Sequence, residues 1–226
     1  MCGIIGIASN KSVSSAIINS LRKLEYRGYD SSGIATLSDG ILNEAKSEGR
    51  VDILEKNLAV KNMSGPIGIG HVRWATHGVP NSINAHPHSS DQVSVVHNGI
   101  IENSDEIKKE LEFKGLKFKS QTDTEVITLL ITEALKENRP LESVFKTLRK
   151  LKGSFALGII FKDFSDIIIG ARRGSPLAVG FSKDENYLGS DSYALKSMTN
   201  KISYLDDGEL CILTKDQVNF FDENLK

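Results

Sequence analysis

A cysteine directly follows the initiator methionine, in the run Met1-Cys2-Gly3-Ile4-Ile5-Gly6-Ile7. Once the methionine is removed, Cys2 carries both a thiol and a free α-amine. A thiol has a pKa of about 8.5 and an α-amine one of about 7.7 to 8.0, so the amine can accept the proton of the thiol near neutral pH. This pairing predicts nucleophilic catalysis without a separate histidine. The alternative is that Cys2 is a small apolar residue that begins an edge strand.

Further along the chain, Arg73, Asn98, Gly99 and Asp123 carry groups that suit the cleavage of an amide. Arg73 ends a predicted strand and can form two parallel hydrogen bonds with a carboxylate. The Asn98 side chain and the Gly99 N–H both donate, and can face one developing oxyanion. Each position also has a simpler interpretation. Arg73 can form a surface ion pair, Asn98-Gly99 is a common turn signal, and Asp123 can begin a helix, where a carboxylate suits the helix dipole.

The histidines offer a competing interpretation, because all five fall in one third of the chain, at His71, His77, His86, His88 and His97. Zinc sites use such side chains, and His86-Pro87-His88 can place two rings on one face of an extended segment. No carboxylate has evident ligand spacing and no His-Glu-x-x-His motif occurs, so we expect no catalytic metal. If the α-amine of Cys2 is not the base, His71, His77 or His97 is the alternative.

The composition limits the kinds of partner. Of 226 residues, 39% are hydrophobic and 25% charged, and the 28 basic and 29 acidic side chains are interspersed, with a net charge of -1. We therefore expect a small-molecule or protein partner and neither a nucleic-acid nor a membrane surface. The two cysteines, Cys2 and Cys211, lie at opposite ends of the chain, which argues against a disulfide framework; Cys211 is expected to be buried. No signal peptide and no apolar run of bilayer length is evident, so a cytoplasmic location is expected.

The elements that position these residues follow from hydrophobic periodicity. Short apolar runs predict strands at residues 3–8, 34–37, 41–45, 67–74, 93–96, 155–161, 167–171, 177–181, 187–189, 209–213 and 218–221. Helical spacing predicts a helix of about three turns after Ser12, and helices at 51–60, 106–113, 122–136 and 141–151, with Ser12 and Ser104 as N-caps. Residues 38–40 predict a hairpin turn, and residues 75–91 a long functional loop. No repeat or linker is evident, so one domain of two packed sheets with helices outside is expected.

Six motifs taken together are similar to those of class II glutamine amidotransferases. They are Cys2-Gly3-Ile4-Ile5-Gly6, Tyr-Arg-Gly-Tyr-Asp-Ser at 26–31, Gly-His-Val-Arg-Trp-Ala-Thr-His-Gly at 70–78, Ala-His-Pro-His at 85–88, His-Asn-Gly-Ile-Ile-Glu-Asn at 97–103 and Thr-Asp-Thr-Glu at 122–125. The motifs occur in the order seen in that family. The specificity of the match comes from the ordered set and not from any one motif.

The resemblance implies an α+β, N-terminal-nucleophile hydrolase fold, a four-layer αββα sandwich with two mainly antiparallel sheets. It implies that Cys2 attacks the side-chain amide of L-glutamine, giving a γ-glutamyl thioester and ammonia, after which water releases glutamate. The matching motif positions imply these roles: an oxyanion hole at Asn98 and Gly99, recognition of the substrate α-carboxylate by Arg73 and of its α-ammonium by Asp123, a pocket lined by Thr76 and His77, gating of the ammonia path by Trp74, and support from Arg27 and His86.

The resemblance covers residues 1–226 as a single glutaminase domain and needs no cofactor. It is closest to the hexosamine-forming branch of the family, in which a sugar-phosphate isomerase domain follows and uses the ammonia on fructose 6-phosphate to make glucosamine 6-phosphate. That domain is absent from this chain, and we expect the isolated glutaminase domain to be monomeric. The alternatives are the glutaminase domain of another class II enzyme, such as amidophosphoribosyltransferase, and a catalytically silent module that binds glutamine or a partner.

Overall fold

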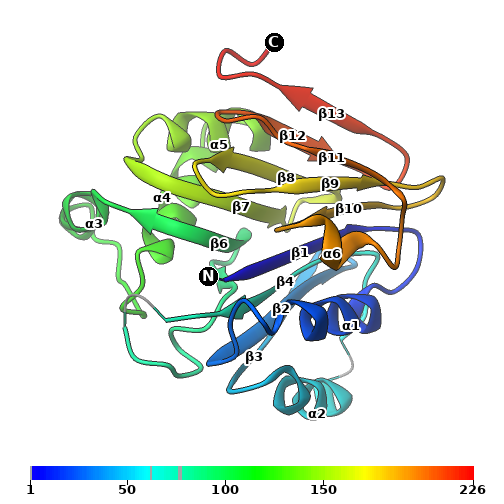
Figure 1. The fold of residues 1–226 in the computed structure, drawn as a ribbon. Coiled ribbons are helices and arrows are strands. Elements are labelled where there is room, and N and C mark those ends of the chain that lie inside the picture. Colours follow the sequence, from blue (N-terminus) through cyan, green and yellow to red (C-terminus); the bar gives the residue numbers. More distant parts are fainter. Residues whose placement is uncertain (1, 62, 76–77) are drawn as a thin grey trace.

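The computed structural model describes residues 2–61, 63–75 and 78–226 (Figure 1). One sheet contains β1 (Gly3–Ala8), β2 (Ser31–Ser38), β3 (Ile41–Glu48), β4 (Ile67–Arg73), β9 (Ala178–Phe181), β10 (Asn186–Gly189) and β11 (Lys201–Tyr204). The other contains β5 (His88–Ser89), β6 (Val93–Ile101), β7 (Gly153–Phe161), β8 (Phe164–Arg173), β12 (Leu210–Leu213) and β13 (Val218–Phe221). The helices are α1 (Ser14–Leu24), α2 (Val51–Lys61), α3 (Ser104–Phe113), α4 (Thr124–Leu135), α5 (Pro140–Leu148) and α6 (Ser192–Leu195).

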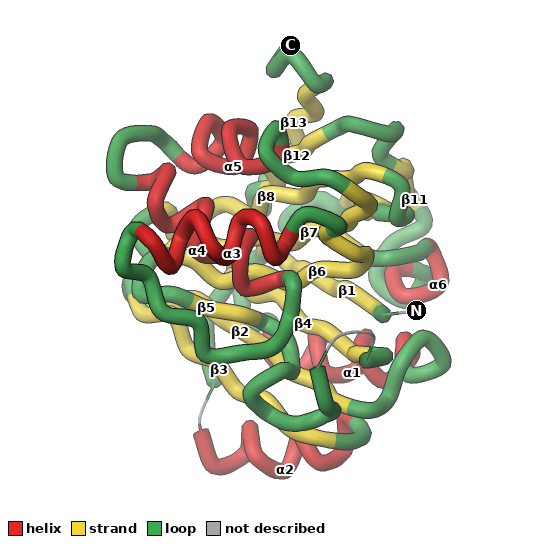
Figure 2. The backbone as a smooth tube through the Cα atoms, turned by 90° about the vertical axis from the view of Figure 1, so that its left-hand side faces the viewer, coloured by secondary structure: helices red, strands yellow, loops and turns green. Residues whose placement is uncertain are grey.

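The two sheets pack face to face, and helices lie against their outer faces, as the two views of Figures 1 and 2 show. The strand order is β11-β9-β10-β1-β4-β2-β3 in one sheet and β13-β12-β8-β7-β6-β5 in the other. Neighbouring strands in the described part of both sheets run antiparallel. The predicted four-layer sandwich with two antiparallel sheets is therefore confirmed.

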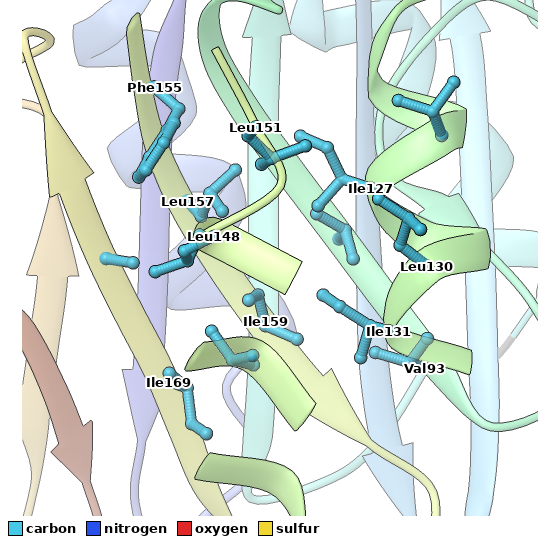
Figure 3. Packing of buried hydrophobic residues seen from close by; sticks show 14 of the residues in the cluster. Val93, Ile127, Leu130, Ile131, Leu148, Leu151, Phe155, Leu157, Ile159 and Ile169 are labelled. Atoms are coloured by element: carbon cyan, nitrogen blue, oxygen red, sulfur yellow. The ribbon is translucent and has the colours of Figure 1, made fainter. Parts of the chain in front are cut away.

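Alternation along the strands builds three apolar layers. In β1, Ile4 faces the second sheet and Ile5 faces α1, because successive side chains of a strand point to opposite sides. Outside the second sheet, residues such as Ile127 of α4 pack on strand residues such as Ile159, as Figure 3 shows. Each such side chain, fully buried, contributes about 1.5–3 kcal/mol to folding. This packing holds the sheets in a fixed relation to each other.

The register of β1 decides where Cys2 lies. β1 sits between β10 and β4 in the interior of its sheet, so the alternative of an edge strand is wrong. Gly3 pairs with Val72, which places the start of β1 beside the end of β4. Ser31 pairs with Arg73 on the other side of β4, so the residues before β2 reach the same end of the sheet. Segments distant in the sequence therefore meet around Cys2.

The alternative that Asn98-Gly99 forms a turn is wrong, because β6 continues through both residues to Ile101 and pairs with β7 along its whole length. Gly99 nevertheless departs from ordinary strand geometry, with φ of +136°, and a Cβ there would overlap the carbonyl oxygen of Ser154. A glycine is required by both the backbone angle and the lack of space. The sequence signal for a turn was thus a glycine needed within a strand.

Several boundaries also differ from the prediction. The N-cap residues are Val13 for α1 and Asn103 for α3, neither with a side-chain cap, so Ser12 and Ser104 are not the caps. Helix α5 ends before the predicted residue 151, and β5 lies inside the predicted loop 75–91. Neither α6 nor β11 was predicted, because α6 is four residues long and most of the side chains of β11 are exposed. The hairpin turn is confirmed, with positive φ at Asp39 and Gly40.

Candidate active site

The Cys2 side chain is half-buried at the start of β1, against the backbone of Trp74. The Trp74 N–H donates to Cys2 Sγ over 3.3 Å, and the sulfur lies 3.5 Å from the Trp74 carbonyl oxygen. Burial raises the pKa of the Cys2 thiol above its ordinary value, while the Trp74 N–H and the charge of Arg73 act in the opposite direction. The resting sulfur is therefore mainly protonated at neutral pH, and a proton acceptor is needed before it can attack.

The backbone carbonyl of Cys2 is held from two sides. Arg27 Nε donates to it over 2.9 Å and Asn98 Nδ2 over 3.0 Å. Arg27 also forms an ion pair of 2.9 Å with Asp191, whose other carboxylate oxygen accepts the Ala194 N–H at the start of α6. The side chain of Arg27 is 10% exposed, so this charge-assisted pair is shielded from solvent. These contacts fix the backbone of the nucleophile to the body of the sheet.

The loop before β2 packs tightly on the segment that follows β4. A Cβ at Gly28 would lie 2.5 Å from the carbonyl carbon of Arg73, so this close approach requires a glycine. Two residues on, the Asp30 carboxylate accepts the Ala75 N–H, and the Asp30 N–H donates to the Arg73 carbonyl over 3.2 Å. This explains why a Gly and an Asp occur at these positions of the 26–31 motif. The loop supports the backbone that contacts the Cys2 sulfur.

The Asn98 side chain reaches Cys2 from the second sheet. Its Nδ2 donates to the Cys2 carbonyl and, over 2.8 Å, to Ser190 Oγ; its Oδ1 lies 3.0 Å from His71 Nε2. Ser190 Oγ also accepts the Ile4 N–H over 2.7 Å. Gly99, next in β6, brings its backbone to the same end of the sheet. The structure thus places donors beside the residue that carries the thiol.

Arg73 and Asp123 carry opposite charges near this end of the molecule. Arg73 is 3% exposed; burial lowers the pKa of its guanidinium, and the charges of Asp30, Cys2 and Asp123 oppose that shift. Asp123 precedes α4 without capping it through its side chain; its carboxylate instead accepts the Ile101 N–H over 2.8 Å. A buried cation and a buried carboxylate whose charges interact suit a ligand that carries both charges. Thr76 and His77, the other predicted pocket residues, lie outside the described residues.

The Trp74 indole is 51% exposed, although its backbone contacts the sulfur. It meets the Tyr29 ring edge to face, with centroids 6.0 Å apart. Tyr29 is itself 49% exposed. A large aromatic side chain therefore lies at the surface, on the residue whose backbone contacts the thiol.

The four described histidines, His71, His86, His88 and His97, are buried and form a group next to Asn98. His71 and His86 stack with centroids 4.2 Å apart, and His88 meets His86 edge to face at 4.9 Å. His86 Nε2 and His97 Nδ1 lie 2.7 and 2.9 Å from the hydroxyl of Thr124 in α4. Burial lowers the pKa of His71 to about 3 and shifts those of His86 and His88 well below the ordinary value. With a pKa of about 3 and its Nε2 engaged with the His97 carbonyl and Asn98, His71 is too weak a base to take the proton of Cys2.

Other predicted features have simple outcomes. Cys211 is fully buried, as predicted, and burial raises its thiol pKa to about 12. Among the described residues, no group of three or more His, Cys, Asp or Glu side chains is arranged to hold a metal ion. In the same part of the chain, none of the helices has the length and apolar character needed to span a bilayer.

Three residues of this site were not predicted from the sequence. Asp30 belongs to the 26–31 motif but was given no role, and Ser190 and Asp191 were not singled out. The last two follow β10 directly and precede a short helix, so a serine and an aspartate between a strand and a helix were the available signal. Their importance depends on the pairing of β10 with β1, which local pattern does not reveal.

Comparison with known proteins gives a consistent result. Residues 71–197 match the model of a family described as "Glutamine amidotransferase domain". The chain is 50% identical over 223 residues to the glutamine–fructose-6-phosphate aminotransferases (isomerizing) of Mesorhizobium japonicum and of Zymomonas mobilis. Each match covers 98% of this chain and 37% of the relative, so the chain spans little more than a third of the length of these relatives.

Solved structures share the fold. Glutamine phosphoribosylpyrophosphate amidotransferase from B. subtilis is 25% identical, with a TM-score of 0.85 over all of this chain and 50% of the other. A glutamine aminotransferase class-II domain protein from Silicibacter pomeroyi is 14% identical, with a TM-score of 0.70 over 98% of this chain and 99% of the other. The second likeness concerns the fold alone. Together with the two antiparallel sheets, these matches support the predicted N-terminal-nucleophile hydrolase fold.

Proposed function

Because the chain belongs to the glutamine amidotransferase family, we propose that it hydrolyses L-glutamine to L-glutamate and ammonia through a γ-glutamyl thioester on Cys2. The main support for the proposal is the set of groups around Cys2, which lies at the start of a central strand. A backbone N–H contacts its sulfur, and an amide donor from the opposite sheet lies beside its carbonyl. A nucleophile and an oxyanion donor are both required for acyl transfer.

The first step needs a base, because burial keeps the thiol protonated. The α-amine of Cys2 can serve once Met1 has been removed, and its ordinary pKa of about 7.7 to 8.0 matches the task. The amine takes the thiol proton as the sulfur attacks the side-chain carbonyl carbon of glutamine. It then returns the proton to the leaving nitrogen, so that ammonia departs and the thioester remains. Water attacks the thioester in the same way and releases glutamate.

Asn98 Nδ2 and the Gly99 N–H would stabilise the oxyanion of both tetrahedral intermediates. The two hydrogens of Nδ2 are directed at the Cys2 carbonyl and at Ser190 Oγ, so the oxyanion must share or replace one of these acceptors. Both are neutral oxygens. A full negative charge is a stronger acceptor than either, which favours this exchange in the transition state and not in the resting enzyme.

The ends of the substrate would be recognised by opposite charges. Arg73 would hold the α-carboxylate and Asp123 the α-ammonium, with Thr76 and His77 lining the same pocket. The geometry of the first two supports the assignment, since both are buried and their charges interact. Trp74 would gate the path of ammonia; its backbone contacts the sulfur and its side chain is half exposed, which supports that role. Arg27 and His86 would act as supports, through the Cys2 carbonyl and through His71 respectively.

The acceptor of the ammonia is proposed from the relatives. Those matched at 50% identity are named for fructose 6-phosphate, whereas the phosphoribosylpyrophosphate enzyme is 25% identical. We therefore favour residues 1–226 as the glutaminase domain of a glucosamine-6-phosphate synthase, which supplies ammonia to a sugar-phosphate isomerase domain. A silent glutamine-binding module is the alternative, but it has no need of a cysteine directly after Met1.

The test is glutamate release from glutamine by purified protein whose mass shows that it begins at Cys2. Cys2→Ser and Cys2→Ala should lose nearly all turnover while keeping the circular dichroism of the parent. Cys211→Ala is the matched control, because it removes the other, buried cysteine and should remain active. Near-parental turnover in Cys2→Ala would refute the mechanism. So would full activity in protein shown by mass to retain Met1, since its Cys2 nitrogen is an amide without useful basicity.

A further inference from the structure

The fully buried side chain of His71 bridges the two sheets, from β4 to β6. Its Nε2 lies 3.0 Å from the backbone carbonyl oxygen of His97 and 3.0 Å from Oδ1 of Asn98. A backbone carbonyl can only accept a hydrogen bond, so the hydrogen of the neutral ring must be on Nε2. The same N–H therefore also faces the Asn98 side chain.

The surroundings keep the ring in this form. Burial lowers the pKa of His71 to about 3, so the imidazole is neutral at pH 7. Its Nδ1 has no hydrogen-bond partner among the described residues, and an N–H there would have no acceptor. The stacked ring of His86, itself bound to Thr124, holds the plane of the imidazole. His71 therefore presents a fixed donor to Asn98.

A fixed donor decides which way the Asn98 amide points. With Oδ1 at His71, Nδ2 is directed at the Cys2 carbonyl and Ser190 Oγ. Turning the amide by 180° would set its NH₂ against the N–H of His71, and its Oδ1 against the Cys2 carbonyl oxygen. One contact would then bring two donors together and the other two acceptors, so neither could be a hydrogen bond. Each buried polar atom left without a partner destabilises the folded state.

We propose that His71 is a positioning residue that holds the Asn98 amide with its donor end toward Cys2, where the oxyanion of acyl transfer forms. His71 does not touch the reacting atoms in this scheme; it acts through Asn98. The inference rests on the proposed function for its effect on catalysis, but the orientation of the amide can be measured without any substrate.

The kinetic test compares His71→Leu, which removes the donor and keeps an apolar side chain, with His71→Gln, whose amide can donate from a similar position. Loss of one oxyanion donor lowers kcat by roughly 10²–10³-fold. An Asn98 amide that is free to turn still donates to the oxyanion part of the time, so its loss of rate should be smaller. We therefore expect His71→Leu to lower kcat about 10- to 100-fold, with KM changed less than about 3-fold. His71→Gln should recover most of the rate. His88→Leu, which removes another buried ring, one that contacts Thr122 and the His86 ring but not Asn98, should keep kcat within about 3-fold of the parent.

A double-mutant comparison separates positioning from general damage. If His71 acts through Asn98, His71→Leu should slow Asn98→Ala no further. A further loss of 10-fold or more in the double variant would overturn the proposal, and so would failure of His71→Gln to exceed His71→Leu.

The direct readout is the side-chain ¹⁵N–¹H signals of Asn98, assigned by their loss in Asn98→Ala. In His71→Leu we expect shifted signals and faster hydrogen exchange; signals unchanged from the parent would refute the positioning role. Shifted signals together with a parent protein that does not hydrolyse glutamine would support the role of His71 while refuting the proposed function. Failure of the positioning role and failure of the proposed function therefore give different results.

Discussion

Lowering the pH from 7.5 to 5.0 should destabilise this fold, because its buried histidines stay neutral while those of the unfolded chain become protonated. Burial lowers the pKa of His71 from 6.5 to about 3. Between these values the unfolded state binds a proton at this residue and the native state does not. Protons therefore favour unfolding, and the stability that is present above pH 6.5 is lost as the pH falls toward 3.

The size of the stability loss depends on how far the pH lies below the pKa of histidine in the unfolded chain. Each pH unit below 6.5 costs about 1.4 kcal/mol per histidine that stays neutral in the native state, so His71 alone should cost about 2 kcal/mol at pH 5.0. The pKa values of His86 and His88 are shifted in the same direction by burial and add to the loss. The cost is a large fraction of the 5–15 kcal/mol that stabilises an ordinary domain.

The assay is urea unfolding followed by far-UV circular dichroism at pH 7.5 and 5.0, on wild type, His71→Gln and Ile69→Val. His71→Gln has one titrating group fewer, so its loss of unfolding free energy between the two pH values should be smaller than that of wild type by about 2 kcal/mol. Ile69→Val is the control: a fully buried neighbour on β4 whose shortening costs about 0.5–1.5 kcal/mol at either pH. Equal pH dependence in wild type and His71→Gln would mean that native His71 titrates normally, and the argument from its burial would fail.

Three further outcomes are expected. In steady-state kinetics, Arg73→Gln and Asp123→Asn should each raise KM for glutamine roughly 30-fold, since a lost charge-assisted contact costs about 2 kcal/mol. If both variants keep the wild-type KM and the wild-type rate, the proposed glutamine pocket is wrong. Exhaustive chelation should leave glutamine hydrolysis intact, and activity lost to chelator and restored by zinc would establish a metal role. Gly99→Ala should unfold at a markedly lower urea concentration than Gly40→Ala. Both glycines have positive φ, but a Cβ at residue 99 would overlap Ser154, whereas a Cβ at residue 40 would meet nothing within 4 Å. Equal urea midpoints for the two variants would show that strand β6 adapts to the added Cβ.

Local sequence pattern was enough to predict the elements that depend on neighbouring residues alone. The run after Cys2 predicted β1 with its observed bounds, because an apolar, β-branched segment between polar ones has few other structures. The turn at Asp39-Gly40 was equally clear, since positive φ at both positions follows from the residues themselves. The order of the motifs was enough to indicate the family, and Cys2 stood out by its place after Met1.

Contacts between residues far apart in the sequence could not be predicted from local pattern. Asn98 and Ser190 are 92 positions apart, and Ile4 and Ser190 are 186 apart, yet they share hydrogen bonds beside Cys2. Such contacts depend on strand order and register, which are set by how whole faces pack together. The same holds for His71, whose role depends on a carbonyl and an amide presented by the other sheet. A sequence displays which groups are available, but the packing of the two sheets determines which of them meet and in which protonation state.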